Sequence, residues 1–248
     1  MTTTVQTSTE TRPTPDPMRR TSRAAGILYL LTFMSMPTLA LFQPVQDGAD
    51  FVLGGGNDTG VLWGSFSEVV VALTGIGTAV VLYPVTSRVS QTAALGFVTS
   101  RVVEGSLIIV GVVSILTLIT LRNDVAGTAG ADPASLATTG DTLIAVYGWT
   151  FLLSQSLMPV FNALCLGYVM YRSRLVPRIL PTLGFIGAAL LLAADIAIFF
   201  GVFDRTGPIG LVAFPIAVWE FSLGVYLTVK GFRPSAVAAL PVPPFTAR

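Results

Sequence analysis

The chain contains no histidine and a single cysteine, Cys165, among its 248 residues. Because this lone thiol lies in an apolar run, neither a disulfide framework nor a zinc site of the usual His and Cys type can be built. Charge is also scarce: Asp, Glu, Lys and Arg together make up 11% of the residues, whereas they make up roughly a quarter of a soluble domain. These absences argue against redox and zinc chemistry, and we expect no cofactor and no metal.

Apolar residues dominate the rest of the composition. They make up 52% of the chain, and the mean hydropathy is +0.76. Both values are typical of membrane proteins, so we expect an all-α fold, a polytopic membrane helix bundle. The formal net charge is only +1. Such a chain presents no basic field for nucleic acid, and the lipid bilayer is the first partner that the composition indicates.

Six stretches are long and apolar enough to cross a bilayer core of about 30 Å at about 1.5 Å of rise per helical residue. They are residues 24–43, 62–84, 95–121, 143–171, 180–203 and 209–230. The flanking sequences are rich in Pro, with Thr at the N-terminal end, and cannot bury enough surface to offset the entropy of ordering. We therefore expect a disordered tail at 1–20, a six-helix transmembrane domain at 21–233 and a second disordered tail at 234–248.

The basic residues gather on one side of this predicted topology. If the N-terminus is inside, nearly all cations lie on the inner side, and the outer loops hold only Arg122 and Arg205. This asymmetry follows the positive-inside rule, so we expect both termini in the cytoplasm and the protein in the inner (cytoplasmic) membrane. The inner loop after the fourth span contains Arg172, Arg174 and Arg178, which are suited to contact anionic lipid headgroups or a partner.

Ionisable residues inside the predicted spans are few and mostly acidic. The third span begins RVVEGSL, which puts Arg101 and Glu104 one helical turn apart on the same face. Glu68, Asp195 and Glu220 lie in the second, fifth and sixth spans. A charge at the bilayer centre costs from about 2.5 to more than 10 kcal/mol. With four acids and one base, some carboxylates are expected to be protonated, to recruit a cation or to face a wet cavity.

Two interpretations of these charges remain open. In the first, an intramembrane charged cluster of Arg101, Glu104, Glu220 and Glu68 marks a functional site, which is the common role of such residues. Alternatively, one arginine bonded to glutamates from different helices simply staples the bundle together.

The fourth span adds neutral polar groups. Gln155 and Asn162 are seven residues apart and share a helix face, and Pro159 frees the backbone carbonyl of Gln155. Together with Asp195, these two amides are candidates to line a polar cavity. The simpler interpretation is hydrogen bonding between helices, which contributes only about 0.6 to 2 kcal/mol.

Several stretches resemble a known family in the same order along the chain. They are SRAAGILYLLTF at 22–33, LYPV at 82–85, LGFVTSRVVEG at 95–105, LCLGYVMYRSRLVPRILPTLG at 164–184 and WEFSLGVYLTVKGF at 219–232. On these segments the chain is similar to the bacterial integral membrane proteins of the domain of unknown function 4386 family, from about residue 20 to 233. The resemblance implies an uncharacterised multi-helix membrane protein and implies no activity, substrate or cofactor.

Three functions from different classes are compatible with the sequence. In the first, Arg101, Glu104 and Glu220 bind a small solute or a proton in support of transport, with Arg101 receiving an anionic group. In the second, the cluster is a staple, and the protein is a structural or accessory subunit that acts in a homo-oligomer or with a partner membrane protein. The third is a membrane-embedded enzyme with carboxylates as acid and base. The sequence favours it least, because histidine and any nucleophile motif are missing.

The geometry of the cluster separates the first two functions. A binding or transport protein predicts a cavity that reaches Arg101, Glu104 and Glu220 and opens to one side. A staple predicts a dry, closely paired cluster with no passage beside it.

Overall fold

All regular structure in the described residues is helical, as expected from the composition. The structure is a computed structural model of the 248-residue chain, and it describes residues 17–46, 48–54, 58–125, 127–203 and 208–241. Six helical segments are long and apolar enough to cross a membrane. The predicted all-α bundle with six transmembrane helices is therefore confirmed, and the chain is a multi-pass membrane protein.

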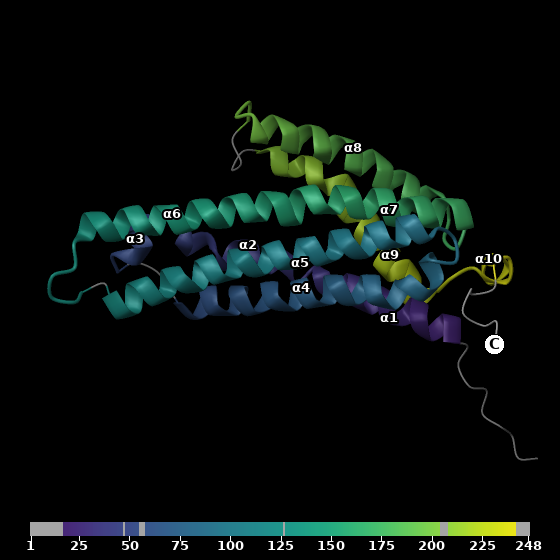
Figure 1. The fold of residues 1–248 in the computed structure, drawn as a ribbon, viewed down its shortest axis with the longest axis horizontal. Coiled ribbons are helices and arrows are strands. Elements are labelled where there is room, and N and C mark those ends of the chain that lie inside the picture. Colours follow the sequence, from purple (N-terminus) through teal and green to yellow (C-terminus); the bar gives the residue numbers. More distant parts are fainter. Residues whose placement is uncertain (1–16, 47, 55–57, 126, 204–207, 242–248) are drawn as a thin grey trace, which may run out of the picture.

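The helices follow one another with short connections (Figure 1). The first span is broken into α1 (Pro17–Thr32) and α2 (Ser35–Leu41), and the fourth consists of α6 (Pro133–Phe151), the π-helical turn η3 (Leu152–Leu157) and α7 (Met158–Ser173). The other spans are α4 (Asp58–Thr86), α5 (Gln91–Thr120) with the π-helical turn η2 (Leu121–Val125), α8 (Ile179–Phe199) and α9 (Phe214–Val229). The short elements are η1 (Gln43–Val45), α3 (Gly48–Val52), η4 (Pro208–Ala213) and α10 (Pro234–Ala238).

Local sequence signals set several helix ends. Ser90 precedes α5 and its hydroxyl accepts a hydrogen bond from the backbone N–H of Ala93. Asp132 caps α6 in the same way, accepting from the N–H groups of Ala134 and Ser135. Each cap satisfies N–H groups that have no partner within the helix. The cap at Asp132 starts the fourth helix ten residues before the predicted span at 143–171.

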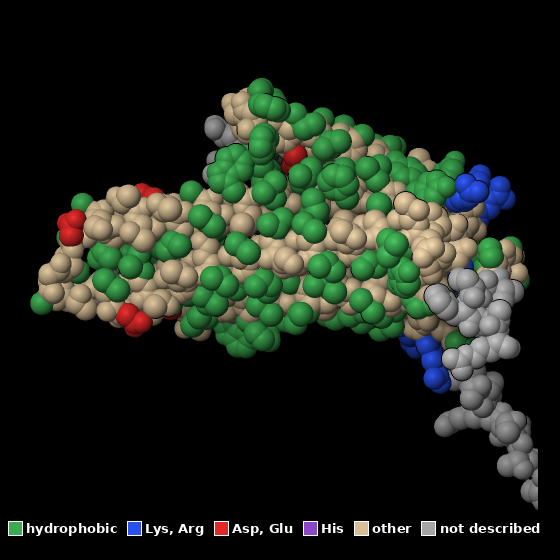
Figure 2. All heavy atoms as spheres, viewed as in Figure 1, with side chains coloured by type: hydrophobic (Ala, Val, Ile, Leu, Met, Phe, Trp, Pro, Cys, Tyr) green, Lys and Arg blue, Asp and Glu red, His purple; other side chains and the backbone are tan. Residues whose placement is uncertain are grey.

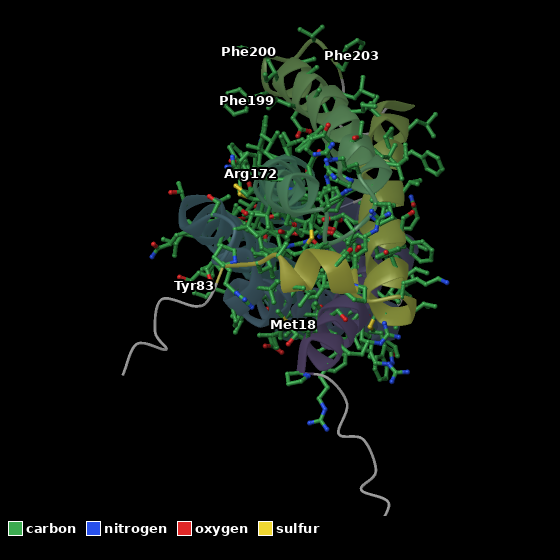
Figure 3. The ribbon with its side chains drawn as sticks, turned by 90° about the vertical axis from the view of Figure 1, so that its right-hand side faces the viewer. Met18, Tyr83, Arg172, Phe199, Phe200 and Phe203 are labelled. Carbon is green, nitrogen blue, oxygen red and sulfur yellow. The ribbon has the colours of Figure 1, made fainter. Side chains whose placement is uncertain are left out.

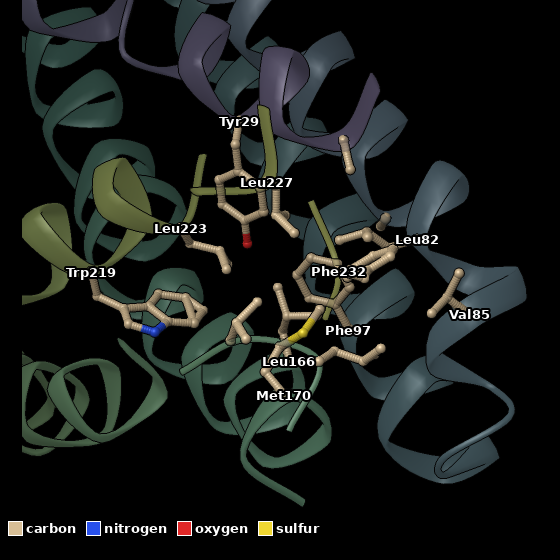
Figure 4. Close-up of a cluster of buried hydrophobic side chains, with 14 of the residues drawn as sticks. Tyr29, Leu82, Val85, Phe97, Leu166, Met170, Trp219, Leu223, Leu227 and Phe232 are labelled. Carbon is tan, nitrogen blue, oxygen red and sulfur yellow. The ribbon is translucent and has the colours of Figure 1, made fainter. Parts of the chain in front are cut away.

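Helix α5 lies at the centre of the bundle. It packs against α4, α6 and α7, while α1 packs against α4 and α9, and α8 covers α7 and α9. The largest hydrophobic cluster lies between α1, α4, α5, α7 and α9, and Figure 4 shows one buried side chain from each of them, Tyr29, Leu82, Phe97, Leu166 and Trp219. This packing fixes the positions of the polar side chains that these helices also carry.

Both boundaries of the transmembrane domain differ from the expected tails. Residues 17–20, assigned to the first tail, form the first turn of α1, and Arg19 in this turn donates to the backbone carbonyl of Val229 at 2.6 Å. Residues 234–238, assigned to the second tail, form α10. Three residues after this helix, the carbonyl of Pro241 accepts a hydrogen bond from Arg88 at 2.7 Å. Composition does not reveal such long-range contacts. The remainder of the two expected tails, 1–16 and 242–248, lies outside the described residues.

Three of the helices are longer than a bilayer requires. The fourth helical segment has 41 residues, about 60 Å at 1.5 Å per residue, against a hydrocarbon core of about 30 Å. Its first part runs beside α3 and the far end of α5 (Figure 1). There a second hydrophobic cluster, which includes Phe42, Phe51, Ile115 and Leu136, is buried. This end of the bundle therefore has its own packed core and projects beyond α8 (Figure 1).

Charges of opposite sign collect at opposite ends of the molecule. Figure 2 shows Lys and Arg at the end where α1 begins and α10 lies, and Asp and Glu at the projecting end. This distribution is the one on which the prediction of cytoplasmic termini rests.

We expect a fusion of a fluorescent protein after Arg248 to fluoresce, and a fusion of a phosphatase that is active only outside the cytoplasm to be inactive at the same position. The reason is the positive-inside rule, by which the basic end is expected to stay on the cytoplasmic side. Fusions after Gly127 should give the reverse pattern. Phosphatase activity at the C-terminus would contradict the orientation.

Replacement of Gly187 by alanine should destabilise the bundle. A Cβ atom at Gly187 would lie 2.6 Å from the backbone nitrogen of Ile216, so α8 and α9 would have to separate. Overpacking of this kind costs about 1 to 3 kcal/mol. We expect a lower thermal unfolding midpoint in detergent. Gly77→Ala is the control, because its Cβ would meet only the Leu28 side chain at 3.4 Å.

Candidate functional site

Arg101 lies inside the protein, in the first half of α5. Only 2% of its surface is exposed to solvent. The guanidinium carbon lies 5.1 Å from the ring centre of Tyr29 and 5.7 Å from that of Phe97. The two rings provide favourable cation–π contacts but cannot accept the guanidinium hydrogen bonds in full. A buried arginine of this kind needs anionic partners.

Two glutamates supply those partners. Arg101 Nη1 donates to both carboxylate oxygens of Glu104, at 3.0 and 3.1 Å, as the spacing of three residues on one helix predicts. Nη2 donates to Oε1 of Glu220 on α9 at 2.9 Å. The expected cluster of Arg101, Glu104 and Glu220 therefore forms, and it joins the third span to the sixth.

Asn162 holds the Glu104 carboxylate from a third helix, α7. Its Nδ2 donates to Glu104 Oε2 at 2.6 Å. Its Oδ1 in turn accepts a hydrogen bond from the Ser100 hydroxyl at 2.5 Å. Asn162 is completely buried, so this chain of hydrogen bonds fixes the orientation of Glu104. Glu220 has no comparable support. Among the described residues, its Oε2 accepts no hydrogen bond.

A cavity with a volume of about 120 Å³ reaches this cluster. Arg101, Glu104 and Glu220 all line it. The rest of the wall comes from the break between α1 and α2, from α4, from the π-helical turn and α7, and from the start of α9; it includes Thr32, Ser35, Val71, Gln155, Pro159 and Ala217. The arrangement combines a paired cation, an excess of carboxylate and open space.

Glu68 was expected in the same charged cluster as Arg101, but the two residues are not bonded to each other. It lies on α4, is 2% exposed and accepts a hydrogen bond from Gln155 Nε2 at 2.6 Å. Gln155 also lines the cavity. Gln155 thus connects Glu68 to the cavity beside Arg101. Asn162, on the same helical segment, donates to Glu104 instead. The two amides have separate partners.

Asp195 lies apart from both groups. Ser156 donates to its Oδ1 at 2.5 Å, and its Oδ2 is buried without a hydrogen-bond partner in the described residues. Gln155 and Ser156 both belong to the π-helical turn η3, just before Pro159. Proline has no N–H to donate to the Gln155 carbonyl, which interrupts the regular helix here. Such π-turns are frequent at functional sites.

The three arginines of the basic loop after α7 are exposed, although Leu175 and Val176 between them are buried and the Leu175 carbonyl accepts from the Arg233 N–H at 2.9 Å. Arg172 donates to the Tyr168 hydroxyl at 3.0 Å, Arg178 donates to the Tyr171 carbonyl at 3.4 Å, and Arg174 ends α7 with a φ of 57°. None of these contacts connects the loop to the cavity. The loop therefore remains a separate candidate surface.

Three contributors to these sites were not identified from the sequence. Ser100 and Ser156 bind Asn162 and Asp195, and Tyr29 lies over Arg101. Nothing in the local sequence distinguishes the two serines from other helical residues. Each meets its partner only because two helices pack in a particular relative rotation. Tyr29 is completely buried and its hydroxyl has no hydrogen-bond partner among the described residues, so its contact with Arg101 is through the ring.

Within the described residues, no group of three or more His, Cys, Asp and Glu side chains could hold a metal ion. The fold and the site together define a multi-pass membrane helix bundle with an arginine–glutamate cluster in its interior. The chain belongs to the family described as domain of unknown function (DUF4386), whose model matches residues 24–231. No curated protein and no solved structure matches the chain.

Loss of the arginine should be the most damaging change at this site. Arg101→Met leaves two buried carboxylates without a cation, and removal of one partner of a buried pair costs roughly 3 to 5 kcal/mol. We expect a large drop in the thermal unfolding midpoint, largely recovered when Glu104→Gln and Glu220→Gln are added. Arg122→Met is the control. Its 2.6 Å pair with Asp58 is partly exposed and should contribute less than about 1 kcal/mol.

Proposed function

We propose that the protein binds a proton or a small solute in the cavity beside Arg101, Glu104 and Glu220, and that this binding supports transport across the membrane. The observation that carries the proposal is the cavity itself. A cluster that only staples helices would be enclosed on all sides by side chains, whereas here all three charged residues line open space. Ionisable residues within a membrane commonly mark such pathways.

The hydrogen bonds favour a proton or a cationic solute over an anion. Both Nη atoms of Arg101 already donate to glutamates, so an anion would have to displace a carboxylate. With both glutamates ionised, the cluster of one base and two acids has a formal charge of minus one. Glu220 Oε2 is the oxygen without a protein donor in the described part of the chain. A proton, or a ligand that donates a hydrogen bond, satisfies both conditions.

The size of the cavity limits the solute. Its volume of about 120 Å³ is well below the roughly 300 Å³ at which pockets for drug-sized ligands begin. It suits protons carried by a few water molecules, or a solute of a few heavy atoms.

Glu68 extends the site toward α4. Gln155 lines the cavity and donates to Glu68, so a third buried carboxyl, besides Glu104 and Glu220, is one side chain away from the cavity. Several carboxyl groups beside one polar cavity form the kind of series through which protons move in transporters. In this proposal Glu220 is the primary binding group and Glu68 a second one.

A structural or accessory role is the second candidate. The completely buried Asn162 and the 2% exposure of Arg101 favour it, because both describe a tightly packed junction of α5, α7 and α9. In that case the protein would act with a partner membrane protein or as a homo-oligomer.

Infrared difference spectroscopy across a pH titration in nanodiscs tests the proposal. We expect a carboxyl band that appears on acidification, is lost in Glu220→Gln and shifts in Arg101→Gln, because Glu220 takes up the proton next to that guanidinium. In proteoliposomes with an internal pH dye, Glu220→Gln should slow proton or solute flux at least tenfold.

Asp195→Asn is the matched control, since it removes a buried carboxylate that does not line the cavity. It should leave the Glu220 band and the flux unchanged. If Glu220 stays ionised throughout and Glu220→Gln only lowers the unfolding temperature, the cluster is a staple and the proposal fails.

A further inference from the structure

A second cavity, with a volume of about 320 Å³, lies at the basic end of the bundle. The start of α1, the end of α9 and α10 enclose it, and Figure 3 shows this end facing the viewer, with Met18 at the start of α1. Its lining combines two cations, Arg19 and Lys230, with apolar side chains that include Met18, Phe232, Pro234 and Val237. Among its described lining residues none is acidic.

Arg19 is held in place before any ligand arrives. Its Nη2 donates to the carbonyl of Val229, the last residue of α9, at 2.6 Å. Its Nη1 is buried and has no hydrogen-bond acceptor among the described residues. Gly231, with a φ of 75°, makes room for it, since a Cβ there would lie 2.5 Å from Nη1. The chain thus fixes a guanidinium whose hydrogen-bonding capacity is only partly used.

Lys230 supplies the second cation from the rim. It directly follows α9 and is exposed, so its ammonium group can reach a ligand without rearrangement of the backbone. It is also the single lysine of the chain. One fixed and one movable cation beside an apolar wall can recognise a group that carries negative charge at one end and hydrocarbon at the other.

The cavity lies beside the ends of two membrane spans, where the membrane surface is expected. The first span begins at Pro17 and the last ends at Val229, and the lining residues flank these two ends. Phospholipid headgroups occupy this depth. We propose that the cavity is a binding site for the phosphate headgroup of an anionic phospholipid, whose glycerol and first methylene groups pack on the apolar wall. This proposal stands independently of the one for the Arg101 site.

The test is the thermal unfolding of the full chain in nanodiscs of phosphatidylcholine with an increasing fraction of phosphatidylglycerol. We expect the unfolding midpoint of the wild type to rise and to saturate. Lys230→Gln should raise the half-saturating fraction of phosphatidylglycerol about fivefold, because it removes a charge-assisted contact to the lipid phosphate. Because Lys230 is exposed, this variant is expected to fold normally.

Arg233→Gln is the matched control. It removes an equal charge three residues away, from an exposed side chain that does not line the cavity, and should leave the half-saturating fraction within twofold of the wild type. Equal losses in both variants would overturn the proposal, since they would indicate general attraction to an anionic surface.

A second arm separates the lipid from free phosphate. Inorganic phosphate and glycerol 3-phosphate are added to the protein in a neutral detergent. Little stabilisation by either at millimolar concentration, together with saturable stabilisation by phosphatidylglycerol, supports the lipid site. Stabilisation by inorganic phosphate that equals that by the lipid, and that is lost in Lys230→Gln, would overturn the lipid assignment in favour of a soluble phosphate ligand.

Discussion

The interior of this protein is organised around one buried guanidinium. Arg101 cannot remain in a membrane interior without anions, because the cost of an unpaired charge there exceeds any single packing contribution. Glu104 lies within reach on the same helix, but a guanidinium offers two Nη groups, and the second is satisfied only by Glu220 on α9. Asn162 then holds Glu104 from α7. The pairing requirement of one side chain thus ties three spans together.

This arrangement pairs both Nη groups of the arginine, leaves its buried Nε without an acceptor among the described residues, and leaves an excess of carboxylate. A staple needs one acid for one base, and the interior holds a second acid at the cluster and a third, Glu68, bonded only to an amide in the described structure. Additional buried carboxylates add desolvation cost without adding an ion pair. Glu104 and Glu220 line the cavity, whereas Glu68 is connected to it only through Gln155.

The sequence was informative where one helix decides the outcome. Span number, span positions and the Arg101–Glu104 pair all follow from apolar length and from a spacing of three residues. It was less informative where two helices must be placed relative to each other. Gln155 and Asn162 share a helical segment, yet they serve different carboxylates, because a π-helical turn lies between the regular helices and rotates Gln155 toward α4. The helical turn at Pro17 was likewise missed, since its support comes from the distant Val229.

The same irregularities explain why the cavity should contain water. Thr32 and Ser35 line it at the break between α1 and α2, and Pro159 lines it just after the π-helical turn. At both places the regular α-helical hydrogen-bond pattern is interrupted: turns close on the carbonyls of Leu30, Leu31 and Phe33 at the first, and Pro159 has no N–H to donate at the second. Within a membrane, irregular backbone is tolerated only where it is buried in protein or lines a water-filled space. Two helix irregularities and a carboxylate oxygen without a protein donor in the described residues meet at one cavity, which is where water or a polar solute is expected.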